Sequence, residues 1–182
     1  IVILLSYILI GEDVMRKTQK ILSFILAILM VMSIIPITAS AETEHGTCGD
    51  NLTWEFNYYT DALTISGTGV MYDYNWNNRP WEGYKDNVNK IVINDGVTSI
   101  GDYAFSGCSS VSNLVLGNNV TSIGSYAFAD CNLTSVTIPE SVTSIGDAAF
   151  KCASMKEFNG KFASGDKLCL IVNNRLIQVA DG

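Results

Sequence analysis

The sequence has little of what side-chain catalysis requires. It contains one histidine, His45, whereas a serine or cysteine nucleophile needs a positioned base beside it. We expect His45 to lie in a mobile segment near the start of the folded part, and the carboxylates are scattered along the chain. A metal site would need further ligands of the right type. The sequence therefore predicts no enzyme activity, no cofactor and no bound metal.

Basic residues are also scarce, with 11 Lys and Arg against 18 Asp and Glu. Residues 1–41 hold three of the basic and two of the acidic residues, which leaves 8 against 16 and a formal charge of −8 for the rest. Such a surface repels phosphate backbones and anionic lipid. Nucleic acid and peripheral membrane surfaces are therefore poor candidate partners.

The apolar run near the N-terminus is short for a membrane span. It covers residues 21–35 with two serines inside it and ends at Pro36, whereas a spanning helix needs about 20 apolar residues. Basic residues at 16–20 precede it and Ala39-Ser40-Ala41 follows, which is the order of a secretory signal peptide. We expect cleavage between Ala41 and Glu42 and a secreted or cell-surface protein; an uncleaved anchoring helix is the alternative.

Both ends of the sequence suggest that its limits are not those of the natural protein. Residues 1–14 precede Met15, which opens a complete signal peptide by itself, so we interpret them as an over-extended gene start. A hairpin of two membrane helices would need a longer first span than residues 1–10 provide. Since the chain stops at Gly182 without an anchor, we expect it to be the N-terminal part of a longer protein.

An internal repeat is the strongest signal in the sequence. V-T-S-I-G-x-x-A-F occurs at residues 97–105, 120–128 and 142–150, with starts 23 and 22 positions apart. A short apolar alternation precedes each copy, and a period of two is typical of a β-strand. Each repeat therefore predicts a strand, a turn, a second short extended piece and a compact helical turn. The predicted N-caps of the helical turns are Asp102, Ser125 and Asp147.

One repeat cannot bury its own apolar side chains, so successive coils must stack. Equivalent residues would then lie about 4.8 Å apart in columns. The glycine after each isoleucine fits a sharp corner that a Cβ would obstruct. The predicted columns are Ile100, Ile123 and Ile145, and Phe105, Phe128 and Phe150.

The pattern V-T-S-I-G-x-x-A-F-x-x-C, followed by an apolar strand, resembles the BspA-like leucine-rich-repeat family over about residues 88–158. The resemblance implies a β-rich repeat solenoid from a bacterial surface protein that binds host or neighbouring-cell components. The third repeat departs from the pattern, because Cys152 comes one residue early and Gly160 replaces an apolar strand residue. We place the repeats at residues 88–160, and the departures in the third copy leave open whether the coils stay regular beyond about Phe158.

We interpret the segments on either side of the repeats as caps, because the strand edges of the end coils would otherwise be exposed to water. Residues 42–87 are similar to the segment that often precedes such repeats, and residues 52–56 and 63–66 form a hairpin-like pair. We interpret them as an N-terminal cap. Within residues 161–182, two apolar strands flank Asn173-Asn174, which predicts a C-terminal β-hairpin.

The five cysteines are an odd number for an exported protein with disulfides. Three of them stand at equivalent repeat positions after the phenylalanine, where a small buried hydrophobe suits the coil. We predict buried thiols at Cys108, Cys131 and Cys152.

Recognition of a partner is the function that these features favour, although a fold alone does not fix a function. Trp76 and Trp81 belong to an aromatic cluster that either covers the first coil, which we favour, or forms an exposed platform. The partner would be an extracellular protein or glycan. A larger cell-surface hydrolase and a passive envelope spacer are the alternatives. The candidate contacts on the predicted sheet are Lys90, Asn113, Ser135 and Thr137.

Overall fold

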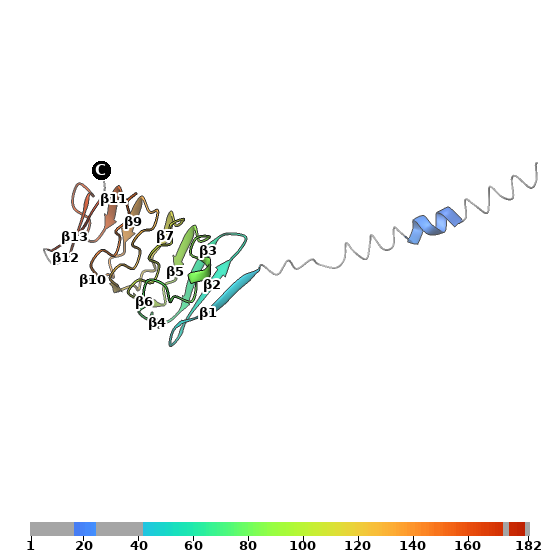
Figure 1. Cartoon of the computed structure of the whole chain (residues 1–182), viewed down its shortest axis with the longest axis horizontal. Coiled ribbons are helices and arrows are strands. Elements are labelled where there is room, and N and C mark those ends of the chain that lie inside the picture. The colour runs from blue at the N-terminus through green and yellow to red at the C-terminus, as the bar shows by residue number, and fades with distance from the viewer. Residues whose placement is uncertain (1–16, 25–41, 173–174, 181–182) are drawn as a thin grey trace, which may run out of the picture. The chain divides into compact units, whose positions relative to one another are not determined.

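The computed structural model describes residues 17–24, 42–172 and 175–180 of a chain that divides into two units, Ile1–Ser40 and Ala41–Gly182 (Figure 1). In the first unit residues 17–24 are helical, and the Ser23 hydroxyl donates to the Gln19 carbonyl at 2.6 Å. Within the described ranges no helix has the length and apolar character to cross a membrane. The predicted cleavage motif lies outside the described residues.

The second unit is rich in strands, as predicted, and begins with a five-stranded sheet in the order β1-β2-β3-β5-β7. β1, β2 and β3 are antiparallel neighbours, whereas β3, β5 and β7 pair in parallel. β9 and β11 form a separate parallel pair that continues the series of strands beyond β7 (Figure 1). The strands are β1 (Thr43–Gly49), β2 (Leu52–Asn57), β3 (Ala62–Gly67), β5 (Lys90–Ile93), β7 (Asn113–Val115), β9 (Ser135–Ile138) and β11 (Glu157–Gly160).

A second parallel sheet, in the order β10-β8-β6-β4, contains the V-T-S-I segments of the repeats. Its strands are β4 (Gly69–Val70), β6 (Val97–Ile100), β8 (Ser122–Ile123) and β10 (Ser144–Ile145). One short 3-10 helix, η1 (Glu82–Tyr84), precedes β5. Where the sequence predicted a C-terminal hairpin, β12 (Cys169–Val172) and β13 (Arg175–Val179) pair antiparallel, while Asn173-Asn174 lie outside the described residues.

The predicted columns of side chains form the core. Ile100, Ile123 and Ile145 are in register on neighbouring strands. The rings of Phe105 and Phe128 stack at 5.2 Å between centroids and 13°, and the rings of Phe128 and Phe150 at 5.3 Å and 5°. All six side chains are buried. Stacked coils therefore share one continuous apolar interior.

The predicted helical turn is wrong: residues 102–107 form a chain of turns whose N–H groups alternate between two kinds of partner. Every second N–H bonds within its own coil, and the N–H groups between them cross to carbonyls of the next coil. The cause is the left-handed φ of 55° at Tyr103, 56° at Tyr126 and 55° at Ala148, which interrupts helical geometry. The crossing bonds of the first coil run from Tyr103, Phe105 and Gly107 to Ser125, Ala127 and Ala129.

The predicted N-cap role of Asp102 needs the same correction. Its Oδ1 accepts a hydrogen bond from the backbone N–H of Ser125 at 2.6 Å, one coil further on. Asp73 Oδ1 accepts from the N–H of Asp102 in the same way, at 2.9 Å. These carboxylates join neighbouring coils, since no helical turn follows Asp102 for them to cap.

Close approach between coils explains the glycines. A Cβ at Gly124 would lie 2.5 Å from the backbone nitrogen of Asp102, and a Cβ at Gly101 would lie 2.0 Å from the Tyr72 oxygen. Gly160 has a φ of 90° and pairs with Ile138, whose carbonyl leaves no space for a Cβ. Regular coil pairing therefore continues to Gly160.

Replacement of Phe128 by alanine should lower the free energy of unfolding by about 3 to 5 kcal/mol, because rings on both sides hold the cavity open. Phe150→Ala should cost less, since Phe150 lies nearer the end of the stack. Tyr59→Ala, at a side chain 68% exposed, is the control and should change stability by less than about 0.5 kcal/mol. Denaturant melts of the three variants measure this; a neutral Phe128→Ala would contradict the stacked core.

Candidate binding surfaces

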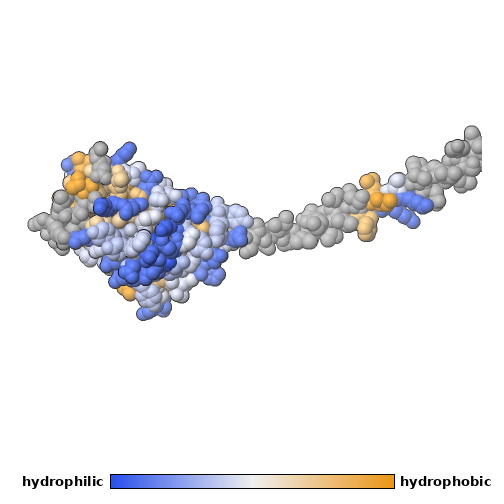
Figure 2. All heavy atoms as spheres, viewed as in Figure 1, coloured by the Kyte–Doolittle hydropathy of each residue, from blue (hydrophilic) through white to orange (hydrophobic). Residues whose placement is uncertain are grey.

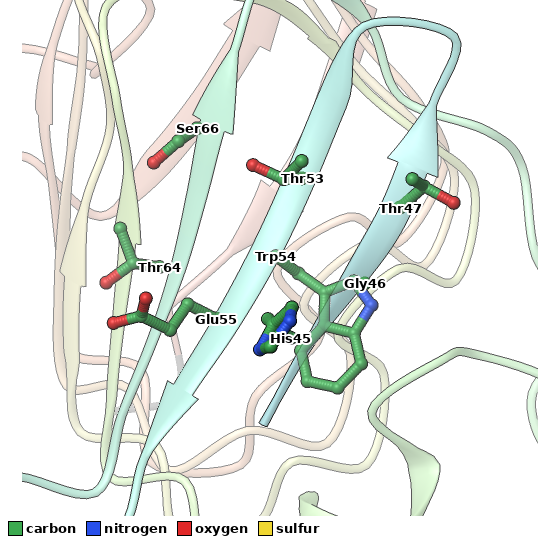
Figure 3. Close-up of a pocket in the computed structure, with 8 residues that line it drawn as sticks. All are labelled: His45, Gly46, Thr47, Thr53, Trp54, Glu55, Thr64 and Ser66. Carbon is green, nitrogen blue, oxygen red and sulfur yellow. The ribbon is translucent and has the colours of Figure 1, made fainter. Parts of the chain in front are cut away.

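The outer face of the five-stranded sheet carries polar side chains in rows. On β2, Thr53 and Glu55 are exposed, whereas Leu52, Trp54 and Phe56 are buried. Cross-strand register aligns Thr47, Thr53 and Ser66 in one row and His45, Glu55 and Thr64 in the next. A hollow of about 500 Å³ lies over these rows, lined by His45, Gly46, Thr47, Thr53, Trp54, Glu55, Thr64 and Ser66 (Figure 3).

The sequence suggested that His45 lies in a mobile segment, and this prediction is wrong. His45 lies in β1, opposite Glu55 of β2. The sequence gives no alternation of apolar residues in Thr43–Gly49, so this strand was not predicted. Its pairing with β2 places the histidine on the rim of the hollow.

The candidate contacts on the sheet fall on two groups of strands. Lys90 begins β5 and Asn113 begins β7, and the two are direct partners in the parallel register. Ser135 and Thr137 are exposed on β9, which pairs with β11. The structure thus brings Lys90 and Asn113 together. Ser135 and Thr137 lie two residues apart on the exposed face of β9.

Trp54 lies between Thr53 and Glu55 on β2, and strand alternation directs its side chain into the core beneath the hollow. Its side chain is 6% exposed and packs edge-on against Trp81 at 6.0 Å between ring centroids. Within the described part of the chain, its indole Nε1 has no hydrogen-bond partner. Gly46 makes room for the ring, because a Cβ there would lie 2.7 Å from Nε1.

The two other tryptophans have opposite environments. Trp81 is 0% exposed, stacks on Phe105 at 5.2 Å and 14°, and donates from Nε1 to the Ala104 carbonyl at 2.9 Å. It extends the phenylalanine column, which is the covering role that we favoured, and it presents no surface to a ligand. Trp76 is 68% exposed and keeps the geometry of a candidate contact.

A second, polar groove of about 350 Å³ crosses the coils along the other sheet. Ser99, Ser122 and Ser144 stand at equivalent positions along it, with Asp73 and Asp102 toward the N-terminal end. Sequence analysis did not single out this groove, although the three serines occupy the same place in each V-T-S-I-G copy. Exposed apolar side chains lie instead at the C-terminal hairpin, in Leu168, Ile171 and Val179 (Figure 2).

Comparison with known families decides what the coils are. Residues 83–164 match the family described as BspA type leucine rich repeat region, in 6 copies. These residues are BspA-type leucine-rich repeats. No curated protein matches the chain.

One solved structure of a bacterial leucine-rich-repeat protein shares the fold. A leucine-rich repeat protein from Eubacterium ventriosum is 24% identical with a TM-score of 0.51, and the match covers 74% of this chain and 48% of that one. This chain therefore spans about half of that protein's length. One from Bacteroides capillosus is 19% identical over 62% and 96% of the two chains, with a TM-score of 0.44. A leucine rich cell surface protein from Faecalibacterium prausnitzii is 18% identical over 76% and 59%, with a TM-score of 0.37.

Arg79 connects the N-terminal segment to the first repeat, and sequence analysis missed it. Its side chain is buried, with the whole residue 4% exposed, and its guanidinium donates to the carbonyls of Ser106 and Tyr103. Nε also donates to Glu82 at 2.9 Å. Burial tends to raise the pKa of Glu82, but hydrogen bonds from Lys85 and Arg79 outweigh it and lower that pKa. The only sequence signal was an Arg-Glu pair three residues apart.

The repeat cysteines are buried thiols, as predicted. All five cysteines of the chain are free, and those in the repeats lie in the core. Cys131 and Cys152 donate to the carbonyls of Phe105 and Phe128, at 3.3 and 3.1 Å. Burial raises the pKa of Cys108 to about 12. Among the described residues, no cluster of three or more His, Cys, Asp or Glu could hold a metal ion.

Arg79→Leu should lower the free energy of unfolding by about 3 kcal/mol, because it leaves buried carbonyls and Glu82 without their donor. Lys85→Leu removes the other, more exposed partner of Glu82 and should cost less than about 1 kcal/mol. Thermal or denaturant melts compare the two. Equal losses would show that the Arg79 contacts to the first repeat contribute nothing specific.

The thiols of Cys108, Cys131 and Cys152 should resist a thiol reagent until the fold opens, because all three sulfurs are buried and the reagent cannot reach them. Titration of the native protein at pH 8 should label none of the three rapidly, whereas the denatured protein should label all of them. Fast native labelling, or a mass showing two disulfides, would refute this assignment.

Proposed function

We propose that this protein is an exported recognition module that binds an extracellular protein or glycan through the outer face of its coil stack. The observation that carries the proposal is the hollow over β1, β2 and β3. It joins short hydroxyl side chains, one histidine and one carboxylate on a face that strand alternation keeps outside the core. Pockets with a few convergent polar groups suit specific binding.

The same face extends along the repeats, which supports an elongated contact. Register continues the row of Glu55 and Thr64 to Val92 and Val115. Lys90 and Asn113 form the adjacent row. In the next repeat Ser135 occupies the place of Asn113 and Thr137 the place of Val115. Repeat proteins use such extended surfaces for partners too large for a pocket.

The hydroxyl groups of Thr47, Thr53, Thr64 and Ser66 can donate and accept hydrogen bonds at the hollow. Such groups favour partners with exposed carbonyl or hydroxyl oxygens, which both proteins and glycans carry. The formal charge of −8 beyond residue 41 disfavours polyanions.

A binding screen of the purified protein against extracellular matrix proteins and a glycan array tests the proposal. Thr64→Arg places a bulky charge in the hollow and should weaken the partner identified by about tenfold or more, about 1.4 kcal/mol. Asn119→Arg adds the same charge at an exposed position outside the hollow and should leave binding unchanged. Equal affinity of both variants would exclude the outer face.

Trp76→Ala separates a second possible contact from folding. Because Trp76 is exposed, the variant should melt like the parent protein. If Trp76 anchors the partner, binding should weaken by about 2 kcal/mol. The absence of any partner in the whole screen would favour a passive envelope spacer.

A further inference from the structure

A second aromatic column stands on the outside of the turn segments. The rings of Tyr103 and Tyr126 stack at 5.0 Å between centroids and 8°. The Tyr103 N–H bonds to the carbonyl of Ser125, and the Tyr126 N–H bonds to the carbonyl of Asp147. Ala148 therefore occupies the next rung of this column, one coil beyond Tyr126.

The column stops one ring short. Tyr103, Tyr126 and Ala148 share the same left-handed backbone, with φ of 55°, 56° and 55°, so their side chains leave equivalent coils in equivalent directions. One face of the Tyr126 ring is covered by Tyr103, while the rung beyond its other face holds only a methyl group. Tyr126 is 36% exposed. The buried phenylalanine column, by contrast, has a ring in every coil from Trp81 to Phe150.

The polar groove ends at the chain neighbours of this open rung. Ser125 precedes Tyr126, Gly146 lies two residues before Ala148, and both line the groove together with Ser122 and Ser144. Asp102 lies in the same lining, one coil before Ser125. An occupant that stacks on the exposed ring can therefore extend toward hydroxyl and carboxylate groups and form hydrogen bonds at the same time.

We propose that the open rung above Ala148 is a carbohydrate subsite, in which one pyranose ring stacks its C–H face on Tyr126 and directs hydroxyls to the serine groove. An aromatic side chain of a peptide would meet polar groups at its edges without satisfying them, and a nucleobase would bring phosphates to an acidic protein. A sugar ring satisfies both the ring face and the hydroxyl groups. This proposal rests on the proposed function for an extracellular glycan as partner, but on a different surface from the hollow.

Saturation-transfer NMR with methyl glycosides of glucose, galactose, mannose and N-acetylglucosamine, each alone, tests the subsite on the whole protein. We expect transfer from tyrosine ring protons to the sugar C–H protons of at least one glycoside, with weak affinity, since one sugar offers few contacts. Tyr126→Ala should weaken that glycoside at least tenfold, and Tyr126→Phe should retain it.

Ala148→Tyr is the decisive variant, because it fills the rung with the residue that the two preceding coils already accept at the same φ. It should fold and should abolish glycoside binding. Tyr59→Ala removes an exposed tyrosine elsewhere and should change nothing. Thr64→Arg, in the hollow, should also leave the glycoside bound, so failure of the outer face and failure of the subsite are distinguishable.

Three results would overturn the proposal. They are the absence of transfer to all four glycosides, undiminished binding in both Tyr126→Ala and Ala148→Tyr, and transfer to N-acetyltyrosinamide without transfer to any glycoside. The last would assign the rung to an aromatic side chain of a protein partner.

Discussion

The backbone of each coil depends on the next coil for its hydrogen bonds. Buried N–H and C=O groups must be paired, and here alternate N–H groups of the first two turn segments cross to the neighbouring coil. Glycine at the corners lets the two backbones approach closely enough for those bonds. Side chains add to them, since Asp102 accepts from Ser125 N–H and the Thr121 hydroxyl donates to the Thr98 carbonyl. The apolar columns stabilise an interface that backbone pairing aligns.

The same requirement explains the residues that cover the first coil. Its carbonyls at Asp102, Ala104 and Ser106 are equivalent to those at Ser125, Ala127 and Ala129, which accept N–H groups of the preceding coil. No coil precedes the first one, and the donors come instead from the N-terminal segment. They are the Tyr74 N–H, the Trp81 indole N–H and the Arg79 guanidinium. Tryptophan suits this position because one side chain supplies both a ring for the phenylalanine column and a donor for the backbone.

Sequence periodicity predicted the features that depend on a local pattern within each repeat. Examples are the strands around Ile91 and Val136 and the isoleucine and phenylalanine columns. Periodicity failed where the partner is distant. Arg79 is buried only because it reaches Ser106, 27 residues away, and no local pattern marks that contact. The helical turn was predicted because Asp102 resembles an N-cap residue. Its carboxylate does accept a backbone hydrogen bond, but the donor is the Ser125 N–H of the next coil. β1 formed a strand without alternation since β2 offered it a free edge.

Binding surfaces were predictable to the extent that strand alternation separates inside from outside, which placed Lys90, Asn113, Ser135 and Thr137 on one side. Comparison of the three V-T-S-I-G-x-x-A-F copies goes further. Seven positions are identical. Those of valine, isoleucine, alanine and phenylalanine are buried in the core, Thr121 bonds to the neighbouring coil, and the serines line the polar groove. The copies differ only at the two x positions, which hold Asp102-Tyr103, Ser125-Tyr126 and Asp147-Ala148 on the outer turn. Packing fixes the apolar positions that must repeat, whereas the outer-turn positions can vary and so distinguish one coil from another for a partner.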